Sequence, residues 1–227
     1  MNVYKSLFLT IGAALFISIS AVHAQVAPDK DWARFGRFEK ANAEVSVKPK
    51  AVLMGDSITE GWASKDPEFF SVNNFLGRGI SGQVTSQMLV RFRKDVLDHA
   101  PEYVVILAGT NDIARNNGFI SLENIFGNIV SMCELARFHD IKPVICSVLP
   151  AARYGWRPEL VGVAAEVIRL NTMLREYASS KGYVYIDFHT VLKDENDGLP
   201  QKHAADGIHP KLECYKIMET LLLDALR

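Results

Sequence analysis

A serine follows the first apolar run of the chain, in the segment MGDSITEGW at residues 54–62. Gly55 permits a tight turn, and Asp56 and Ser57 are both residue types that cap helices. The segment therefore predicts a turn from a strand into a helix. At such a turn Ser57 is either a capping hydroxyl or a nucleophile. A nucleophilic serine needs a base and an oxyanion site elsewhere in the chain.

The best candidate for the base is His209, one of six histidines. Asp206 precedes it by three residues, and on a turn that offset lets the carboxylate reach one ring nitrogen. A carboxylate in that position fixes the tautomer of the imidazole and stabilises the imidazolium. The alternative is structural: Asp206 caps a short turn and Pro210 opens the final helix.

Two further segments, GISG and GTND, offer hydrogen-bond donors for an oxyanion. Gly82 lets a backbone N–H approach a developing negative charge closely, and the Asn111 side chain supplies an amide donor. The backbone N–H of Ser57 is a third candidate. Both residues also have an ordinary interpretation, since Gly82 suits a turn and Asn111 suits an Asx-turn.

Apolar runs and helical segments alternate along the chain, and this pattern predicts the elements that position these residues. Strands that are apolar throughout are buried on both faces, which indicates a parallel sheet with helices on both sides. The predicted strands are 51–55, 72–79, 103–109, 142–148 and 183–188, and the predicted helices are 85–99, 121–139, 159–182 and 211–226.

In a parallel sheet, every loop that follows a strand opens at the same edge, where open α/β sheets bind ligands. Ser57, Gly82 and Asn111 follow the first three strands, and the Asp206–His209 pair follows the last. The topology therefore predicts that these four loops meet.

The segments GDSITEGW, GISG, GTND and DGIHP, in this order between residues 54 and 210, resemble the conserved blocks of the SGNH (GDSL) hydrolase superfamily. The resemblance implies a flavodoxin-like α/β/α sandwich of three layers with a five-stranded parallel sheet. It also implies Ser57 as nucleophile, His209 as base oriented by Asp206, and Gly82 and Asn111 as oxyanion donors beside the Ser57 N–H. No metal or organic cofactor is implied.

The loop PAARYGWRPE, which follows the fourth strand, is the candidate wall of a substrate site. It contains Tyr154, Trp156 and Arg157; Trp62 and Arg78 are similar candidates. Aromatic faces suit sugar rings, and an arginine suits a carboxylate or a phosphate. The alternative is a surface loop whose tryptophan packs without a ligand.

Exported members of the superfamily often remove short acyl groups from carbohydrates. Together with an export signal at the N-terminus, the resemblance predicts an exported serine esterase that hydrolyses short-chain esters, above all acetyl esters, of a small molecule or oligosaccharide through an acyl-enzyme. A lysophospholipase- or thioesterase-type acylhydrolase is the first alternative. The second, from another class, is a non-catalytic flavodoxin-like binding module.

The chain of 227 residues begins with Lys5 followed by about sixteen uncharged residues, and Ala24 then fits a signal-peptidase site. We expect a signal peptide over residues 1–24, a helical or linker segment over 25–50 that packs Trp32, Phe35 and Phe38, and one hydrolase domain over 51–227. The mature protein is then periplasmic or secreted.

Bulk composition excludes some classes of partner. The formal net charge of -1 and the lack of a run of Lys or Arg do not suggest nucleic-acid binding. No segment after the signal reads as a membrane span. Cys133, Cys146 and Cys214 lie within apolar patterns, so they are expected as buried thiols and not as a disulfide. The sequence does not indicate an oligomeric state.

Overall fold

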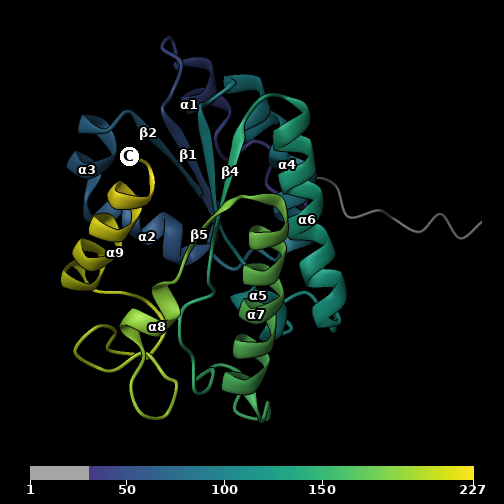
Figure 1. Cartoon of the computed structure of the whole chain (residues 1–227), viewed down its shortest axis with the longest axis vertical. Coiled ribbons are helices and arrows are strands. Elements are labelled where there is room, and N and C mark those ends of the chain that lie inside the picture. The colour runs from purple at the N-terminus through teal and green to yellow at the C-terminus, as the bar shows by residue number, and fades with distance from the viewer. Residues whose placement is uncertain (1–30) are drawn as a thin grey trace, which may run out of the picture. The chain divides into compact units, whose positions relative to one another are not determined.

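The computed structural model describes residues 31–227, so the signal predicted for residues 1–24 lies outside the described part. The centre of the described part is a sheet of five parallel strands in the order β2-β1-β3-β4-β5 (Figure 1). Gly55 lies opposite Gly79 and Leu107 in the neighbouring strands, so these strands end together and their loops leave from one edge. The strands are β1 Ala51–Gly55, β2 Phe75–Gly79, β3 Tyr103–Leu107, β4 Lys142–Cys146 and β5 Val184–Ile186.

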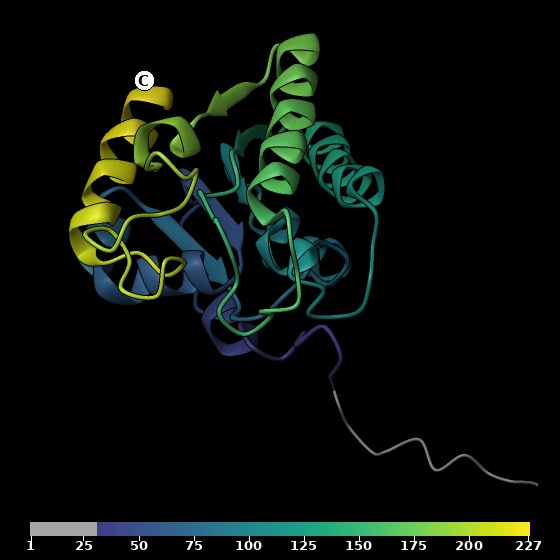
Figure 2. The same ribbon diagram turned by 90° about the horizontal axis from the view of Figure 1, so that it is seen from below.

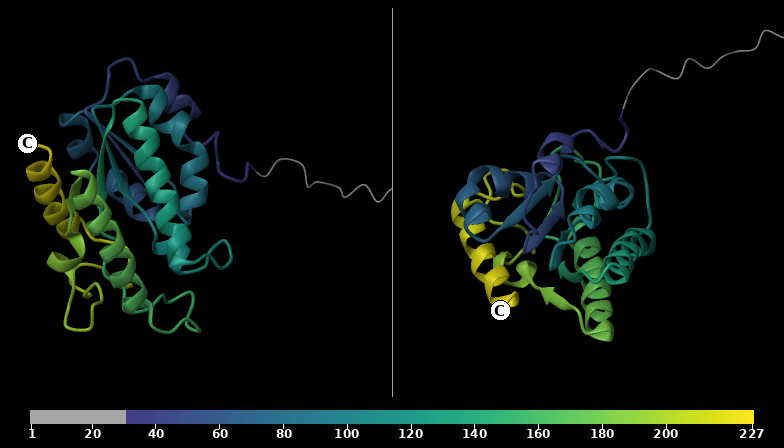
Figure 3. Two further views of the ribbon diagram at one scale, coloured as in Figure 1. Left: turned by 45° about the vertical axis from the view of Figure 1, so that its right-hand side comes forward. Right: turned by 90° about the horizontal axis from the view of Figure 1, so that it is seen from above.

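Helices cover both faces of the sheet, as Figure 2 shows in the view from below. One face carries α4 (Thr85–Asp95), α6 (Leu122–Phe138) and α7 (Val163–Lys181), which bury the strand side chains that point to that side. The other face carries α2 (Ser57–Lys65), α3 (Pro67–Val72), α8 (Phe188–Leu192) and α9 (Leu212–Ala225). In Figure 3 the yellow α9 lies beside the blue α2–α3 region.

Side chains alternate between the two faces of the sheet, which creates two cores. Val52 and Met54 of β1 belong to the core under α4, α6 and α7, whereas Leu53 belongs to the core under α2, α3 and α9. The strand order and the two helical layers confirm the predicted flavodoxin-like sandwich of three layers. Three short elements complete the described part: α1 Glu39–Ala43, the 3-10 helix η1 Leu97–His99 and α5 Thr110–Ile113.

Several strands are shorter than predicted because helix caps interrupt them. The second predicted strand began at residue 72, but α3 occupies residues 67–72, with Pro67 in its first turn and the Asp66 carboxylate accepting a bond from the Phe69 N–H. The fifth strand ends at Ile186 because Asp187 caps α8. Helix α7 begins at Val163, after Gly162 in the left-handed region.

Of the two expectations for residues 25–50, helix or linker, the structure contradicts a helix over Trp32, Phe35 and Phe38. These residues lie in turns, Trp32 and Phe35 are exposed, and the short helix α1 follows them at Glu39–Ala43. Backbone carbonyls hold this segment to the domain: the Gln83 side-chain amide donates to the oxygen of Ala33.

The three cysteines are buried and unpaired, which confirms the prediction of core thiols. Burial raises the pKa of the Cys133 thiol to about 12 and that of the Cys214 thiol to about 11. Within residues 31–227, no helix combines the length and apolar character that a bilayer span requires.

Candidate active site

The turn from β1 into α2 places Ser57 at the start of a helix. Asp56 caps this helix, and its Oδ1 accepts a hydrogen bond of 2.9 Å from the Ile58 N–H. Because Asp56 is the cap, the Ser57 hydroxyl is left for another partner. The turn is tight: a Cβ at Gly79 of the neighbouring strand would overlap the backbone at Asp56 and Glu60.

That partner is His209, which lies 152 positions further along the chain. Ser57 Oγ is 3.0 Å from His209 Nε2, and His209 Nδ1 is 2.7 Å from Asp206 Oδ2. A carboxylate accepts hydrogen bonds, so Nδ1 carries the proton and the lone pair of Nε2 faces the serine hydroxyl. The fold thus brings together the three residues that the sequence predicted as a catalytic set.

The sequence left open whether Asp206 orients the His209 imidazole or caps a turn. In the structure Asp206 does both, because it also caps the turn before His209. Its Oδ1 accepts hydrogen bonds from the backbone N–H groups of Ile208 (3.0 Å) and His209 (2.8 Å). Burial raises the pKa of the Asp206 carboxyl, but the bonds from the His209 side chain and these N–H groups outweigh it and lower that pKa to about 2. Asp206 is therefore ionised at neutral pH and holds the imidazole in one orientation.

The candidate oxyanion donors differ in whether they already make a hydrogen bond within the protein. Within residues 31–227, the backbone N–H groups of Ser57 and Gly82 make no hydrogen bond to the protein, and Gly82 has a φ of 78°. The Asn111 amide is already bonded: Nδ2 donates to Gln83 O (3.1 Å) and to Asp56 Oδ2 (3.2 Å). A developing oxyanion at Asn111 would share an N–H with one of these acceptors.

Two buried carboxyl groups support this region: Asp56, which the sequence indicated only as a helix cap, and Asp112, which sequence reasoning passed over. Burial raises the pKa of Asp56 and that of Asp112 to about 6 each. Asp112 accepts hydrogen bonds from the backbone N–H (3.0 Å) and the hydroxyl (2.6 Å) of Thr85 at the start of α4. Both acids stand inside the GDS and GTND segments, so the signal was present in the motifs themselves.

Arg91 of α4 also supports this region, and the sequence analysis missed it. It is fully buried and pairs with Asp95 at 2.9 Å. Its other donors reach Gln83 Oε1 (2.6 Å), Gly55 O (3.1 Å) and the carbonyl of Arg78 (2.9 Å). One guanidinium thus ties the ends of β1 and β2 to the loop that carries Gly82. No local sequence pattern predicts that Arg91 joins these segments, because the role depends on partners from β1, β2 and the loop that carries Gly82.

Three of the expected substrate-binding side chains are buried, which corrects those expectations. Trp62 is 1% exposed; it stacks on Tyr215, and its Nε1 donates to Glu219. Arg78 is 5% exposed, because its Nε donates to Asn42 of α1 (2.9 Å) and its guanidinium lies over an aromatic ring. Tyr154 has no exposed surface. None of the three is available to a substrate in this structure.

The other two expected residues, Trp156 and Arg157, lie near the loop after β3. Trp156 is 43% exposed, and its Nε1 donates to Asn116 Oδ1 (2.9 Å), while Asn116 Nδ2 donates to Asn111 Oδ1 (2.7 Å). Trp156 is therefore one residue removed from the candidate oxyanion amide. Arg157 donates to the carbonyls of Ala114 and Arg115, so much of its donor capacity fastens its own loop.

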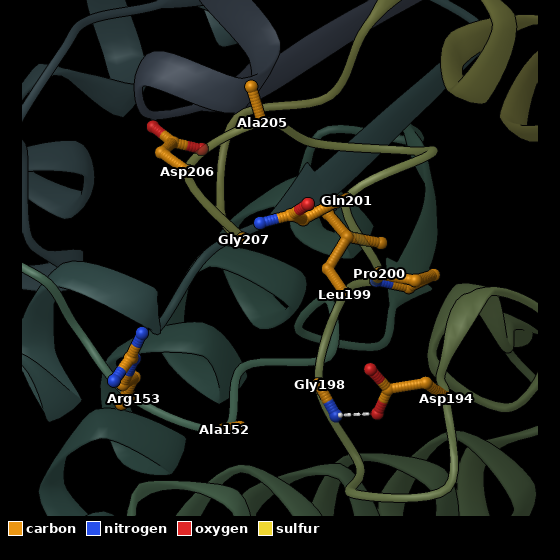
Figure 4. Close-up of a pocket in the computed structure, with 10 residues that line it drawn as sticks. All are labelled: Ala152, Arg153, Asp194, Gly198, Leu199, Pro200, Gln201, Ala205, Asp206 and Gly207. Atoms are coloured by element: carbon orange, nitrogen blue, oxygen red, sulfur yellow. Dashed lines mark hydrogen bonds between the residues drawn. The ribbon is translucent and has the colours of Figure 1, made fainter.

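A cavity of about 360 Å³ borders Asp206 (Figure 4). The loop after β4 contributes Ala152 and Arg153, and the segment between α8 and α9 contributes Asp194 and residues 198–201 and 205–207. Sequence reasoning considered the loop after β4 but passed over Arg153.

Comparison with known proteins places the chain among acylhydrolases. The model of the GDSL-like lipase/acylhydrolase family matches residues 53–217. A crystal structure of a Bacteroides fragilis protein assigned as an acylhydrolase is 43% identical, with a TM-score of 0.85, and the match covers 87% of this chain and 98% of that one.

Two curated relatives add context. The isoamyl acetate-hydrolyzing esterase 1 homolog of Homo sapiens is 27% identical over 186 residues, which are 71% of this chain and 74% of that protein. An uncharacterized lipoprotein of Bacillus subtilis is 38% identical over 130 residues, which are 50% of this chain and 54% of that protein. The match to the lipoprotein thus spans about half of its length.

Proposed function

Because this chain belongs to the GDSL-like lipase/acylhydrolase family and is a carboxylic ester hydrolase, we propose that it removes short acyl groups, above all acetyl, from carbohydrates outside the cytoplasm. Ser57 is the nucleophile of this proposal. The observation that carries it is the continuous line of hydrogen bonds from Ser57 Oγ through His209 to Asp206, with distances of 3.0 and 2.7 Å.

The proposed reaction has two halves that use the same imidazole. In the first half, His209 Nε2 takes the proton of Ser57 as Oγ attacks the ester carbonyl. The N–H groups of Ser57 and Gly82 and the Asn111 amide stabilise the oxyanion. When the intermediate collapses, His209 returns the proton to the alcohol oxygen and the alcohol leaves.

In the second half, His209 takes a proton from water, and the resulting hydroxide attacks the acyl-serine. Collapse of this second intermediate gives the carboxylic acid and returns the proton to Ser57 Oγ. Asp206 stays ionised throughout and stabilises the imidazolium that forms in each half. Besides the ester and this water molecule, the proposed steps use side chains and backbone groups of this chain.

Two features support a short acyl group on a sugar. One relative is named for the hydrolysis of isoamyl acetate, an acetyl ester. The exposed indole of Trp156 beside the Asn111 loop offers an apolar ring face, and such faces pack well against sugar rings. An acetyl ester of a sugar fits both features, because it has a short acyl group and a sugar ring that can pack on the indole.

Export rests on the pattern of residues 1–24 and on the relative that is named a lipoprotein. We propose cleavage after Ala24. The N-terminal sequence of the protein recovered from the periplasm or the medium then begins at Gln25, and a protein that keeps Met1 contradicts the proposal.

The central experiment compares the wild-type protein with Ser57→Ala on 4-nitrophenyl acetate. We expect kcat to fall by at least about a thousandfold, because the variant has no group to acylate. Equal rates would remove Ser57 from the mechanism. Acetyl to palmitoyl esters, followed by acetate release from acetylated oligosaccharides, test the substrate class. A maximum at long chains would replace the sugar esterase by a lipid acylhydrolase.

A further inference from the structure

The cavity beside Asp206 lies next to the proposed catalytic residues without containing Ser57. Its volume of about 360 Å³ falls within the usual range of small-molecule sites, about 300–1,000 Å³. In Figure 4, Arg153 and Asp206 border one side of the cavity, and Leu199, Pro200 and Gln201 lie across from them. The cavity is thus formed by the loops that follow β4 and β5.

In the proposed mechanism, the cavity lies on the side of the ester that leaves as the alcohol. The three oxyanion donors come from the loops after β1, β2 and β3, so the carbonyl oxygen points toward those loops. The alcohol oxygen must instead lie next to His209 Nε2, which gives it a proton. Asp206, on the same loop as His209, borders the cavity, so the cavity lies on the side of the base and not on the side of the oxyanion donors.

Arg153 is the charged residue of this cavity whose binding capacity is unused. Its side chain is exposed, and among residues 31–227 it forms no ion pair or hydrogen bond; Figure 4 draws a bond only between Asp194 and Gly198. A guanidinium presents parallel N–H donors that match the two oxygens of a carboxylate.

The two carboxylates of the cavity are, by contrast, already engaged. Asp194 Oδ1 accepts bonds from the N–H groups of Asn196 (2.9 Å) and Gly198 (3.0 Å). Asp206 holds His209 and its own turn. Both still repel a negative ligand, so an anion in the cavity has its favourable place at Arg153 and away from the two acids. The charges therefore favour one orientation of a singly charged ligand.

We propose that this cavity binds the alcohol portion of the ester and that Arg153 selects alcohols that carry a carboxylate, as acidic sugars do. The inference rests on the proposed function, since it assigns one side of the same catalytic centre. It adds a substrate class that the family membership does not specify.

Two acetyl esters that differ only in charge test this selection: 4-acetoxybenzoic acid and its neutral counterpart 4-acetoxybenzamide. Each kcat/KM is divided by the rate of the same ester with hydroxide, which removes the difference in leaving-group reactivity. We expect the wild-type protein to prefer the acid by at least about fivefold, an exposed charge-assisted contact being worth less than a buried one. Arg153→Gln should bring the ratio close to one, mainly through KM, and Arg153→Lys should keep part of the preference.

Arg137→Gln is the matched control, because this exposed arginine lies in the last turn of α6, where the chain approaches the start of β4 at the opposite edge of the sheet. It makes the same change of net charge and should keep the wild-type ratio. The inference is overturned if the wild-type protein shows no preference, if Arg153→Gln keeps it, or if Arg137→Gln loses it equally.

A binding measurement separates this inference from the proposed function. The product alcohols 4-hydroxybenzoate and 4-hydroxybenzamide are compared as inhibitors of 4-nitrophenyl acetate hydrolysis. Tighter inhibition by the benzoate, lost in Arg153→Gln, supports the subsite. Equal inhibition by both alcohols, with hydrolysis still dependent on Ser57, overturns the subsite alone. Hydrolysis independent of Ser57 overturns the proposed function and, with it, this inference.

Discussion

Asn111 is held in place on both ends of its side-chain amide. Its Oδ1 accepts a bond from Asn116, and its Nδ2 donates to Gln83 O and Asp56 Oδ2. Such an amide is preorganised, because little reorientation is needed when negative charge develops nearby.

Replacing Asn111 with Ala removes the only side-chain donor of the proposed oxyanion site. We expect kcat for 4-nitrophenyl acetate to fall by about a hundred- to a thousandfold with a small change in KM, the usual effect of losing one such donor. Steady-state kinetics on the folded variant, verified by circular dichroism, measures this. A loss below about tenfold would mean that Asn111 does not contact the oxyanion.

Ser57, Gly82 and Asn111 were accessible from sequence because each stands in the loop or turn after a strand whose type and direction the apolar pattern predicts, whereas Asp206 and His209 were found by their spacing of three residues. β1, β2 and β3 end in register, so Ser57, Gly82 and Asn111 reach one edge without any long-range information. The burial of Trp62 and Arg78 could not be predicted in this way. Their partners are Glu219 on α9 and Asn42 on α1, and only the packed fold brings those helices to them.

The ends of the elements were also harder to predict than their existence. Asp66 and Asp187 each begin a helix within residues that are apolar enough to continue a strand, and their side-chain hydrogen bonds decide the competition. Helix α4 was predicted as an element, but nothing in its sequence showed that Arg91 points inward to join three other segments.

The variant Arg91→Lys tests whether Arg91 of α4 positions the proposed catalytic residues. Lysine keeps a positive charge near Asp95 but lacks the fork that reaches Gly55 O, Arg78 O and Gln83 together. We expect the free energy of unfolding to fall by about 1–3 kcal/mol, as for a lost buried hydrogen bond, and kcat to fall at least about tenfold.

Denaturant unfolding and kinetics at a temperature where the variant is fully folded separate the two effects. A role in positioning predicts a loss of kcat that persists in the folded variant, with KM nearly unchanged. A variant that is less stable but retains the wild-type kcat would limit Arg91 to a structural role.

The buried acids beneath the site make the stability of the whole domain depend on pH. Burial raises the pKa of Asp112 from 3.8 to about 6, so between these values the folded state binds a proton that the unfolded state has released. The contribution of Asp112 to the free energy of unfolding therefore falls as pH rises through this window and is level outside it. At about 1.4 kcal/mol per pKa unit, this one group accounts for about 3 kcal/mol.

Asp112→Asn removes this titration while keeping the shape of the side chain. Between pH 4 and pH 7, the free energy of unfolding of the variant should rise relative to that of the wild-type protein by up to about 3 kcal/mol. This expectation does not depend on how stable the variant is at pH 4. Urea unfolding of both proteins across this range measures the difference, which cancels the titration of shared groups that do not interact with Asp112. Asp98→Asn, at an exposed carboxyl, serves as the control and should follow the wild-type curve.

The size of this gain also reports on Asp56, because the Asp112 charge is one of the causes that raise the pKa of Asp56. Removing that charge lowers the pKa of Asp56, so the carboxylate that caps the Ser57 helix stays ionised to lower pH. The pH dependence of stability that remains in the variant should then shift to lower pH. A wild-type and a variant curve that stay parallel within about 0.5 kcal/mol would show that Asp112 ionises as readily in the folded domain as in the unfolded chain.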